Sequence, residues 1–381
     1  MSNMPASAHE PQTLRARHAQ DPHRPHFHFC APSNWMNDPN GLIWWNGAYH
    51  LFYQYNPLGA FHRNVHWGPA DSRDLAHWHD MPIALMPDAD GGDKSGCWSG
   101  TAVNHDGTAR IFYTGVFPEA QFTATSDDPD LAVWHKHRTN PIIPAPPDEL
   151  QIVMGPYSPN FRDPFVWREG DVWYMILAVG LEDIGGGVLL YRSHDLLAWE
   201  YHGIVHSGRI SPDASVWECP NLFALDDAHV LLVSELPEAR HTYYQVGAFD
   251  GRRFTPRATG KTDASPYVYA ALTMRAPDER RLFWGWIKEG RPTDVQQQIG
   301  WSGALTLPRV LRVEGDVLRQ QPAPELAVLR GQVLTAQSDL QLASGQRVAL
   351  AESAHAELFI TLDAGASLSI QLLCSPDAEE Y

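Results

Sequence analysis

The stretch YHLFYQY, residues 49–55, is a short, mostly apolar run that follows a turn signal, Asn46-Gly47. Runs of this kind recur at intervals of roughly 50 to 60 residues, the period expected of a propeller blade. Each run follows a turn signal, and another short apolar run precedes each turn, so every unit contains a β-hairpin. The five runs are YHLFYQY at 49–55, RIFYTGV at 110–116, VWYMILA at 172–178, HVLLVSE at 229–235 and RLFWGWI at 281–287.

Three of the units share a second feature, a polar turn that leads to Trp: SRDLAHW at 72–78, DPDLAVW at 128–134 and SHDLLAW at 193–199. Hairpin units that cannot each bury two sheet faces must pack against one another, and radial packing of such units gives a propeller. A β-sandwich of irregular strands is the alternative, but it does not predict so long a period. The sequence therefore predicts an all-β fold with a five-bladed β-propeller over residues 25–316.

The composition narrows the classes of partner. The chain has 381 residues and a formal net charge of -17, which disfavours nucleic acid and anionic membranes and favours a neutral or cationic ligand. Its 14 Trp, 13 Tyr and 14 Phe suit apolar cores and sugar-binding pockets alike. The four cysteines have neither a CxxC pair nor zinc-type spacing, so neither a metal site nor a disulfide framework is indicated.

The two ends of the chain differ from the repeats. Residues 1–24 are polar and lack the apolar core of a signal peptide, so we expect a mobile leader and a cytoplasmic protein. Beyond the repeats, residues 317–381 contain alternating runs at 356–362 and 367–373 that predict strands. Exposed edges of these strands leave two alternatives: a reduced second domain, or a domain that a second copy of the chain completes in a homo-oligomer.

One residue stands at the head of the first hairpin strand in each unit. Because equivalent strands of a propeller converge on one end of its central channel, we expect these residues to occupy equivalent places around one pocket. They are Asp38, Ser99, Asp163, Glu218 and Tyr269. Three acids would then meet at the channel mouth.

Three acids in one pocket suit the cleavage of a glycosidic bond. One carboxylate attacks the sugar or activates water, and a second protonates the leaving oxygen. Carboxyls placed together push their pKa values apart, which allows one to stay ionised while another keeps its proton. A single Asp before Pro is more often a turn or strand-end cap, but three acids at matching repeat positions make that explanation weak.

The blocks around these acids resemble the signatures of glycoside hydrolase family 32, the invertases, fructan hydrolases and sucrose-6-phosphate hydrolases. The acids lie in WMNDPNG at 35–41, FRDP at 161–164 and WECPN at 217–221. Further matching blocks are FYQYNP at 52–57, HWGPADSRDLAHW at 66–78, GCWSGTAV at 96–103 and GWSGALTLPR at 300–309. The resemblance covers roughly residues 26 to 330. It implies a five-bladed propeller followed by a β-sandwich, which would be shortened in residues 317–381 because the family's sandwich normally needs more residues.

The resemblance also implies roles for the acids. Asp38 would be the nucleophile that forms a covalent fructosyl-enzyme, Glu218 the general acid and base, and Asp163 the residue that holds the fructose hydroxyls. Such an enzyme retains the anomeric configuration and requires neither metal nor organic cofactor. The remaining candidates for the substrate site are Asn37, Gln54, Trp67, Trp98, Ser99, Arg162, Cys219, Tyr269 and Trp286.

Two residues depart from the family pattern, Pro69 after HWG and Leu272 in YAALTM. The reaction also has alternatives. A fructosyltransferase would use the same intermediate, and a fructan-binding propeller would have lost catalysis, although retention of all three acids argues against the latter. The sequence leaves the preferred donor open among sucrose, sucrose 6-phosphate, inulin and levan.

Overall fold

The computed structural model describes residues 11–236, 241–338, 340–343, 345–349, 353 and 356–370. They belong to two compact units, Met1–Glu325 and Leu326–Tyr381. No helix among the described residues is long and apolar enough to cross a bilayer.

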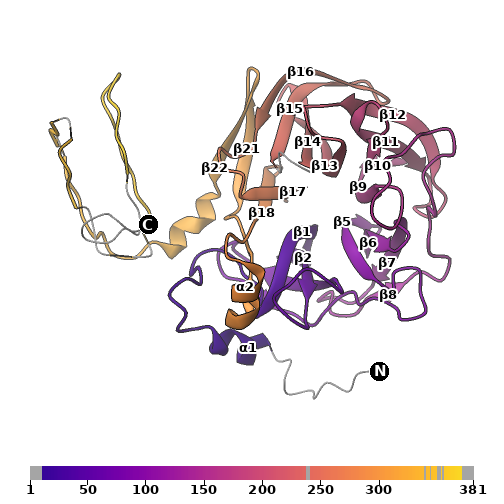
Figure 1. Cartoon of the computed structure of the whole chain (residues 1–381), viewed down its shortest axis with the longest axis horizontal. Helices are drawn as coiled ribbons and strands as arrows, with labels where there is room; N and C mark the ends of the chain where they lie inside the picture. The colour runs from indigo at the N-terminus through magenta and orange to yellow at the C-terminus, as the bar shows by residue number, and fades with distance from the viewer. Residues whose placement is uncertain are drawn as a thin grey trace. The chain divides into compact units, whose positions relative to one another are not determined.

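The first unit is a five-bladed β-propeller, as predicted. Five sheets stand around a common centre, and each is a meander whose first strand is innermost (Figure 1). The blades are, in order, β1 (Asn34–Trp45), β2 (Ala48–Asn56), β3 (His66–Ser72) and β4 (His79–Asp80); β5 (Gly96–His105), β6 (Thr108–Val116), β7 (Ala120–Ser126) and β8 (His135–Lys136); β9 (Phe161–Glu169), β10 (Val172–Leu181), β11 (Gly185–Ser193) and β12 (Glu200–Gly208); β13 (Val216–Leu225), β14 (Ala228–Leu236), β15 (Thr242–Phe249) and β16 (Phe254–Lys261); β17 (Val268–Arg275), β18 (Arg281–Ile287), β21 (Arg309–Glu314) and β22 (Val317–Pro322).

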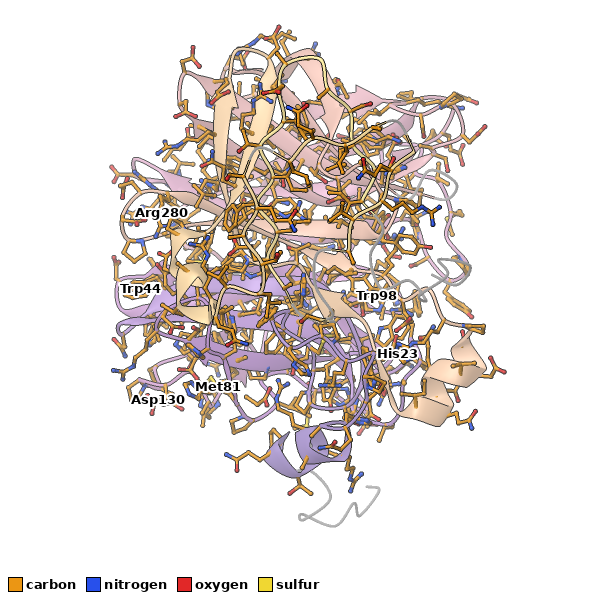
Figure 2. The ribbon with its side chains drawn as sticks, turned by 90° about the vertical axis from the view of Figure 1, so that its left-hand side faces the viewer. His23, Trp44, Met81, Trp98, Asp130 and Arg280 are labelled. Carbon is orange, nitrogen blue, oxygen red and sulfur yellow. The ribbon has the colours of Figure 1, made fainter. Side chains whose placement is uncertain are left out.

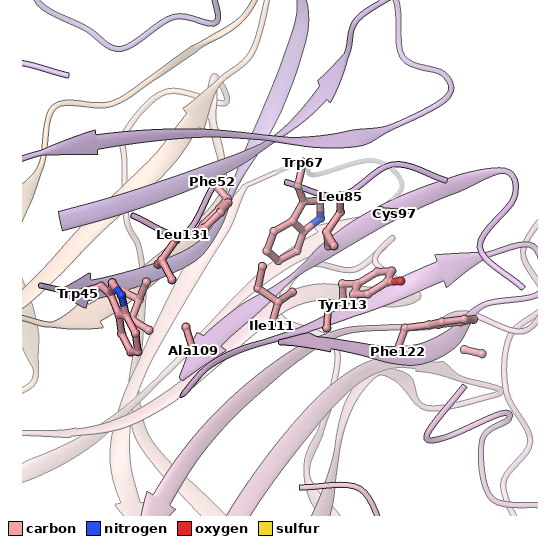
Figure 3. Packing of buried hydrophobic residues seen from close by; sticks show 13 residues of the cluster. Trp45, Phe52, Trp67, Leu85, Cys97, Ala109, Ile111, Tyr113, Phe122 and Leu131 are labelled. Carbon is pink, nitrogen blue, oxygen red and sulfur yellow. The ribbon is translucent and has the colours of Figure 1, made fainter. Parts of the chain in front are cut away.

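The five repeat runs are the second strands β2, β6, β10, β14 and β18. These strands are apolar along much of their length because blades cover both of their faces; β2, for example, is buried throughout. Figure 3 shows the core cluster of buried residues that includes Phe52, Trp67, Ile111 and Tyr113, from the first two blades. Packing between blades therefore supplies the core that a single hairpin lacks.

The polar turns that lead to Trp have one structural explanation. In each, a Leu with positive φ is fully buried, and its carbonyl accepts a hydrogen bond from the indole three residues later. An Asp near the start of the turn caps backbone N–H groups, as Asp74 does for Ala76 and His77. The three Leu residues are Leu75, Leu131 and Leu196. These turns anchor the outer edge of their blades in the core.

The end of the propeller chain returns to its beginning. The short strand β19 (Trp301–Ser302) pairs in parallel with β1, while β20 (Ala304–Leu305) pairs with β18. Helix α2 (Thr293–Ile299) precedes β19, and the 3₁₀ helix η2 (Pro324–Leu329) follows β22. The pairing of β19 with β1 links the fifth blade to the first.

Residues 11–24 are not the mobile leader that the sequence predicted; residues 1–10 of that leader lie outside the described residues. Helix α1 (Pro11–Arg17) buries Leu14, and Arg15 forms an ion pair with Asp80 of β4. Farther along, Asp21 accepts a hydrogen bond of 2.6 Å from Nε1 of Trp301. These contacts fix the segment beside the point where the ring closes.

The predicted domain boundary at residue 316 was also wrong. It falls in the turn between β21 and β22, which pair with each other along their whole length as the outer hairpin of the fifth blade. In the second unit, the described residues contain no strand, so the predicted β-sandwich is not confirmed there. The run at 356–362 is not a strand, and residues 371–373 of the other run lie outside the described part of the chain. Homo-oligomerisation through this region stays a prediction.

Candidate active site

The innermost strand of every blade carries a β-bulge, in which two residues oppose one on the second strand. The bulged pairs are Asn37-Asp38, Trp98-Ser99, Asp163-Pro164, Cys219-Pro220 and Ala270-Ala271. In the last three blades the first bulge residue has positive φ. Bulges interrupt pairing and redirect side chains, which is why they are common next to active sites.

The five predicted residues do not occupy equivalent places, contrary to our expectation. Asp38 and Ser99 are second in their bulges, Asp163 is first, and Glu218 and Tyr269 stand immediately before theirs. Adjacent residues of an extended strand point in different directions. The three acids therefore enter the site from different directions, and the Cys219 thiol contacts both Asp38 and Asp163.

Asp38 is surrounded by donors from three blades. Its Oδ2 accepts a hydrogen bond of 2.6 Å from the Ser99 hydroxyl, and its Oδ1 accepts one of 3.0 Å from the Asn37 amide. The thiol of Cys219 lies 3.6 Å from Oδ2. Burial raises the pKa of Asp38 to about 6, and Glu218 adds to this, whereas the Ser99, Asn37 and Cys219 donors act in the opposite direction. Asp38 is thus mostly ionised at neutral pH.

Asp163 is buried in the third blade and contacts the fourth. Its Oδ2 accepts a hydrogen bond of 2.8 Å from the backbone N–H of Cys219, and the Cys219 thiol lies 3.5 Å away. Burial raises the pKa of Asp163 well above its ordinary value, and the nearby carboxylates of Glu218 and Asp38 add to the effect, while Arg162 opposes it. A carboxyl in these surroundings readily holds a proton.

Glu218 receives one donor on each carboxylate oxygen. Oε1 accepts a hydrogen bond of 2.7 Å from Nη1 of Arg162, and Oε2 accepts one of 2.7 Å from the Tyr269 hydroxyl. Its side chain keeps 17% of its surface exposed, against 7% for Arg162. Glu218 is therefore held in place and still accessible to a ligand.

Polar neighbours extend this network. The Asn37 amide donates to Oε1 of Gln54 at 3.0 Å, and the Gln54 amide donates to the Ser99 hydroxyl. Nε1 of Trp35, which the sequence did not single out, fixes Asn37 through a hydrogen bond of 2.8 Å to its Oδ1. Asn37, Gln54 and Ser99 therefore share one series of hydrogen bonds with Asp38.

The three predicted tryptophans differ in where they lie relative to the site. Trp67 is fully buried in the core, and its Nε1 donates to the backbone oxygen of Trp98, so it supports the site from behind and does not line it. Trp98, labelled in Figure 2, is half-buried and lies over the Arg162 guanidinium at 5.4 Å. Trp286 is half-buried and packs edge-on against Trp35 at 5.8 Å between ring centroids. The placement of Trp67 in the pocket was wrong because its apolar surface is used between the first two blades.

A pocket lies against the inner strands near these carboxylates. Its lining includes Leu272, one of the two departures from the family pattern, whereas Pro69 lies on the third strand of its blade. The pocket is lined by Pro39, Ser99, Gly100, Thr101, Asp163, Pro164, Cys219, Pro220, Ala271 and Leu272. Within the described parts of the chain, no three or more His, Cys, Asp or Glu side chains are grouped to hold a metal ion.

Glu119 is a further charged residue that the sequence did not reveal. It lies in the turn between β6 and β7, is 4% exposed, and its carboxylate binds Arg162 through two hydrogen bonds. It stands outside every repeat position, and the signal that could have drawn attention to it is an acid in an otherwise apolar and small-residue turn, VFPEAQF.

Comparison with known proteins agrees with this geometry. The model of the glycosyl hydrolases family 32 N-terminal domain matches residues 28–322. Sucrose-6-phosphate hydrolase of Escherichia coli is 36% identical over 332 residues, which are 81% of this chain and 66% of that protein. The chain thus spans about two thirds of the length of this relative.

Two solved structures share the fold and hold sugars. A mutant family 32 β-fructofuranosidase of Bombyx mori in complex with sucrose has a TM-score of 0.74 and 29% identity, covering 87% of this chain and 73% of that one. A mutant fructan 1-exohydrolase IIa of Cichorium intybus in complex with 1-kestose has a TM-score of 0.72 and 29% identity, covering 82% of this chain and 63% of that one. Both resemble this chain across most of its described length.

Proposed function

We propose that this chain, which belongs to glycoside hydrolase family 32, is a retaining hydrolase that releases terminal β-fructofuranose from sucrose or short β-fructans. The observation that carries the proposal is the meeting of Asp38, Asp163 and Glu218 from three blades: the Cys219 thiol lies 3.6 Å from Asp38 and 3.5 Å from Asp163, and the carboxylate of Glu218 is close enough to raise the pKa of both aspartates. No single blade supplies more than one of these acids, so the site exists only in the closed propeller.

Asp38 is the proposed nucleophile. Ser99 and Asn37 donate hydrogen bonds to its carboxylate and favour the ionised form, which attacks the anomeric carbon of fructose. The C–O bond to the leaving sugar breaks as the bond to Asp38 forms. A covalent fructosyl-enzyme results, and its later hydrolysis restores the original configuration.

Glu218 is the proposed general acid and base. It delivers a proton to the leaving oxygen in the first step and takes one from water in the second, so that atoms and charge balance over the cycle. Arg162 and Tyr269 hold its two oxygens and so orient the carboxyl. The exposed part of the side chain allows it to reach a bound sugar.

Asp163, Asn37 and Gln54 are the proposed contacts of the fructose hydroxyls. Their oxygens and amide protons lie around the same carboxylate network, and interactions that strengthen as the ring flattens lower the barrier. The sugars bound in the two solved structures support sucrose and 1-kestose as substrates, and the name of the Escherichia coli relative adds sucrose 6-phosphate. A fructosyltransferase, in which a sugar replaces water in the second step, is the alternative reading of the same site.

Product analysis tests the proposal. The purified protein is incubated separately with sucrose, sucrose 6-phosphate, 1-kestose, inulin and levan, and the products are resolved by chromatography. Free fructose from any donor supports the hydrolase, and the ranking of rates identifies the preferred donor. New oligosaccharides would assign a transferase, and no product from any donor would overturn the proposal.

A further inference from the structure

We infer that Glu119 is a positioning residue for the acid and base Glu218 and acts through Arg162. The inference rests on the proposed function, because it assumes that Glu218 gives a proton to the leaving sugar. Glu119 comes from the second blade, Arg162 from the third and Glu218 from the fourth. The three side chains form one continuous series of charged hydrogen bonds across two blade boundaries.

The contact between Glu119 and Arg162 is a bidentate ion pair. Nε of Arg162 donates to Oε2 of Glu119 at 2.9 Å, and Nη2 donates to Oε1 at 2.8 Å. Both side chains are buried, with 2% of the Glu119 surface and 7% of the Arg162 surface exposed. This geometry fixes the plane of the guanidinium as well as its position.

The pairing determines which part of Arg162 remains for Glu218. Nε is used by Glu119, and Nη2 is shared between Glu119 and the side-chain oxygen of Asn160. Nη1 is the nitrogen that reaches Glu218, at 2.7 Å. Glu119 therefore limits Arg162 to a single contact with one oxygen of Glu218, while Tyr269 contacts the other oxygen.

The charge of Glu119 has a second effect. Without Glu119, the bidentate face of the guanidinium would be free to turn to Glu218 and change the orientation of its carboxyl. With Glu119 in place, the positive charge of Arg162 is shared between two carboxylates.

Glu119 also touches the strand that carries Asp163. Its Oε2 accepts a hydrogen bond of 2.8 Å from the backbone N–H of Phe161, at the start of β9. Its own backbone N–H donates to the Ser158 hydroxyl. The turn between β6 and β7 is thus joined to the third blade at the entrance to the site.

The test compares two donors, sucrose and an aryl β-fructofuranoside whose phenolate leaves without protonation. In Glu119→Gln, the charge is lost and the amide faces guanidinium N–H groups. We expect kcat for sucrose to fall about 10- to 100-fold, because acid catalysis is worth about 10²–10⁴-fold, while the first release of phenol from the aryl fructoside, measured as a pre-steady-state burst, slows less than about 3-fold. Glu119→Asp keeps the charge and is expected to recover part of the loss on sucrose.

Controls separate a positioning role from general damage. Glu235→Gln alters another fully buried glutamate, whose carboxylate binds Ser211 and Trp217, and it should leave the ratio of the two rates unchanged. Glu218→Gln should lose turnover of sucrose and keep the first release of phenol from the aryl fructoside; if it does not, the proposed role of Glu218 fails first. An unchanged rate ratio in Glu119→Gln, alongside a selective loss in Glu218→Gln, would overturn the inference about Glu119 alone.

Discussion

Replacing Ser99 with Ala changes one hydrogen bond to the proposed nucleophile. The Ser99 hydroxyl accepts a hydrogen bond from Gln54, so its single proton is directed to Oδ2 of Asp38. In Ser99→Ala, that oxygen keeps only the weak Cys219 thiol donor and a 3.5 Å approach from the Gln54 amide. The ionised form of Asp38 loses its shortest contact.

The expected shift follows from the strength of such a bond. A hydrogen bond to a charged group contributes about 1.5–3 kcal/mol, and about 1.4 kcal/mol corresponds to one pKa unit. The pKa of Asp38, raised by burial to about 6, should therefore rise by about 1 to 2 further units in the variant. Movement of the Gln54 amide toward Asp38 would place the shift near the lower end of that range.

The assay is kcat/KM for sucrose as a function of pH. The nucleophile must be deprotonated, so activity is lost as pH falls through the pKa of Asp38, near pH 6 in the natural protein and near pH 7–8 in Ser99→Ala. Ser234→Ala is the matched control, because this buried hydroxyl contacts Thr242 and the backbone of Ala270 and should leave the acid limb unchanged. An acid limb that stays near pH 6 in Ser99→Ala would refute the role of this hydroxyl.

Three further predictions concern the site and its support. Asp38→Asn should raise the free energy of unfolding at pH 7 by about 1–3 kcal/mol. Folding raises the pKa of this carboxyl to about 6, so the unsubstituted protein loses stability as pH rises from about 4 to about 6, and the variant does not. Urea unfolding should show that the gain shrinks toward pH 4, and a difference that does not depend on pH would contradict the prediction. Tyr269→Phe removes the donor 2.7 Å from Glu218 and should lower kcat for sucrose about 10-fold, as measured by initial rates; an unchanged kcat would show that the hydroxyl does not orient the acid. Gly186→Ala would place a Cβ 2.2 Å from the ring of the fully buried Trp217, which should lower the free energy of unfolding by about 1–3 kcal/mol, and an unchanged thermal midpoint would refute that clash.

Much of the fold follows from the sequence because blade packing imposes a long, regular pattern. The second strand of each blade is covered on both sides, so it appears as an apolar run at a constant interval. The turns that lead to Trp repeat because a buried Leu with positive φ and an indole hydrogen bond recur in three blades. Both requirements are local, so they appear in the sequence as residue types at regular spacings.

The site was predictable in its members but not in its arrangement. The three acids stand near the heads of repeats, yet their positions relative to the bulges differ by one or two residues between blades. A shift of strand register leaves no signal in the sequence. Glu119 escaped notice because it lies in a turn and acts through Arg162 from another blade. Helix α1 was also missed, because its sequence is mostly polar and shows no apolar pattern around the buried Leu14 and the ion pair of Arg15 that attach it to the propeller.

The most direct test of the central claim is to trap the fructosyl-enzyme. Glu218→Gln, which lacks the base for the second step, is mixed with an aryl β-fructofuranoside, and the intact protein and its proteolytic peptides are examined by mass spectrometry. The account predicts a mass increase of one fructosyl unit located on the peptide that carries Asp38, and its absence from the Asp38→Asn, Glu218→Gln double variant. Release of the phenol without any covalent adduct, or an adduct on another residue, would contradict it.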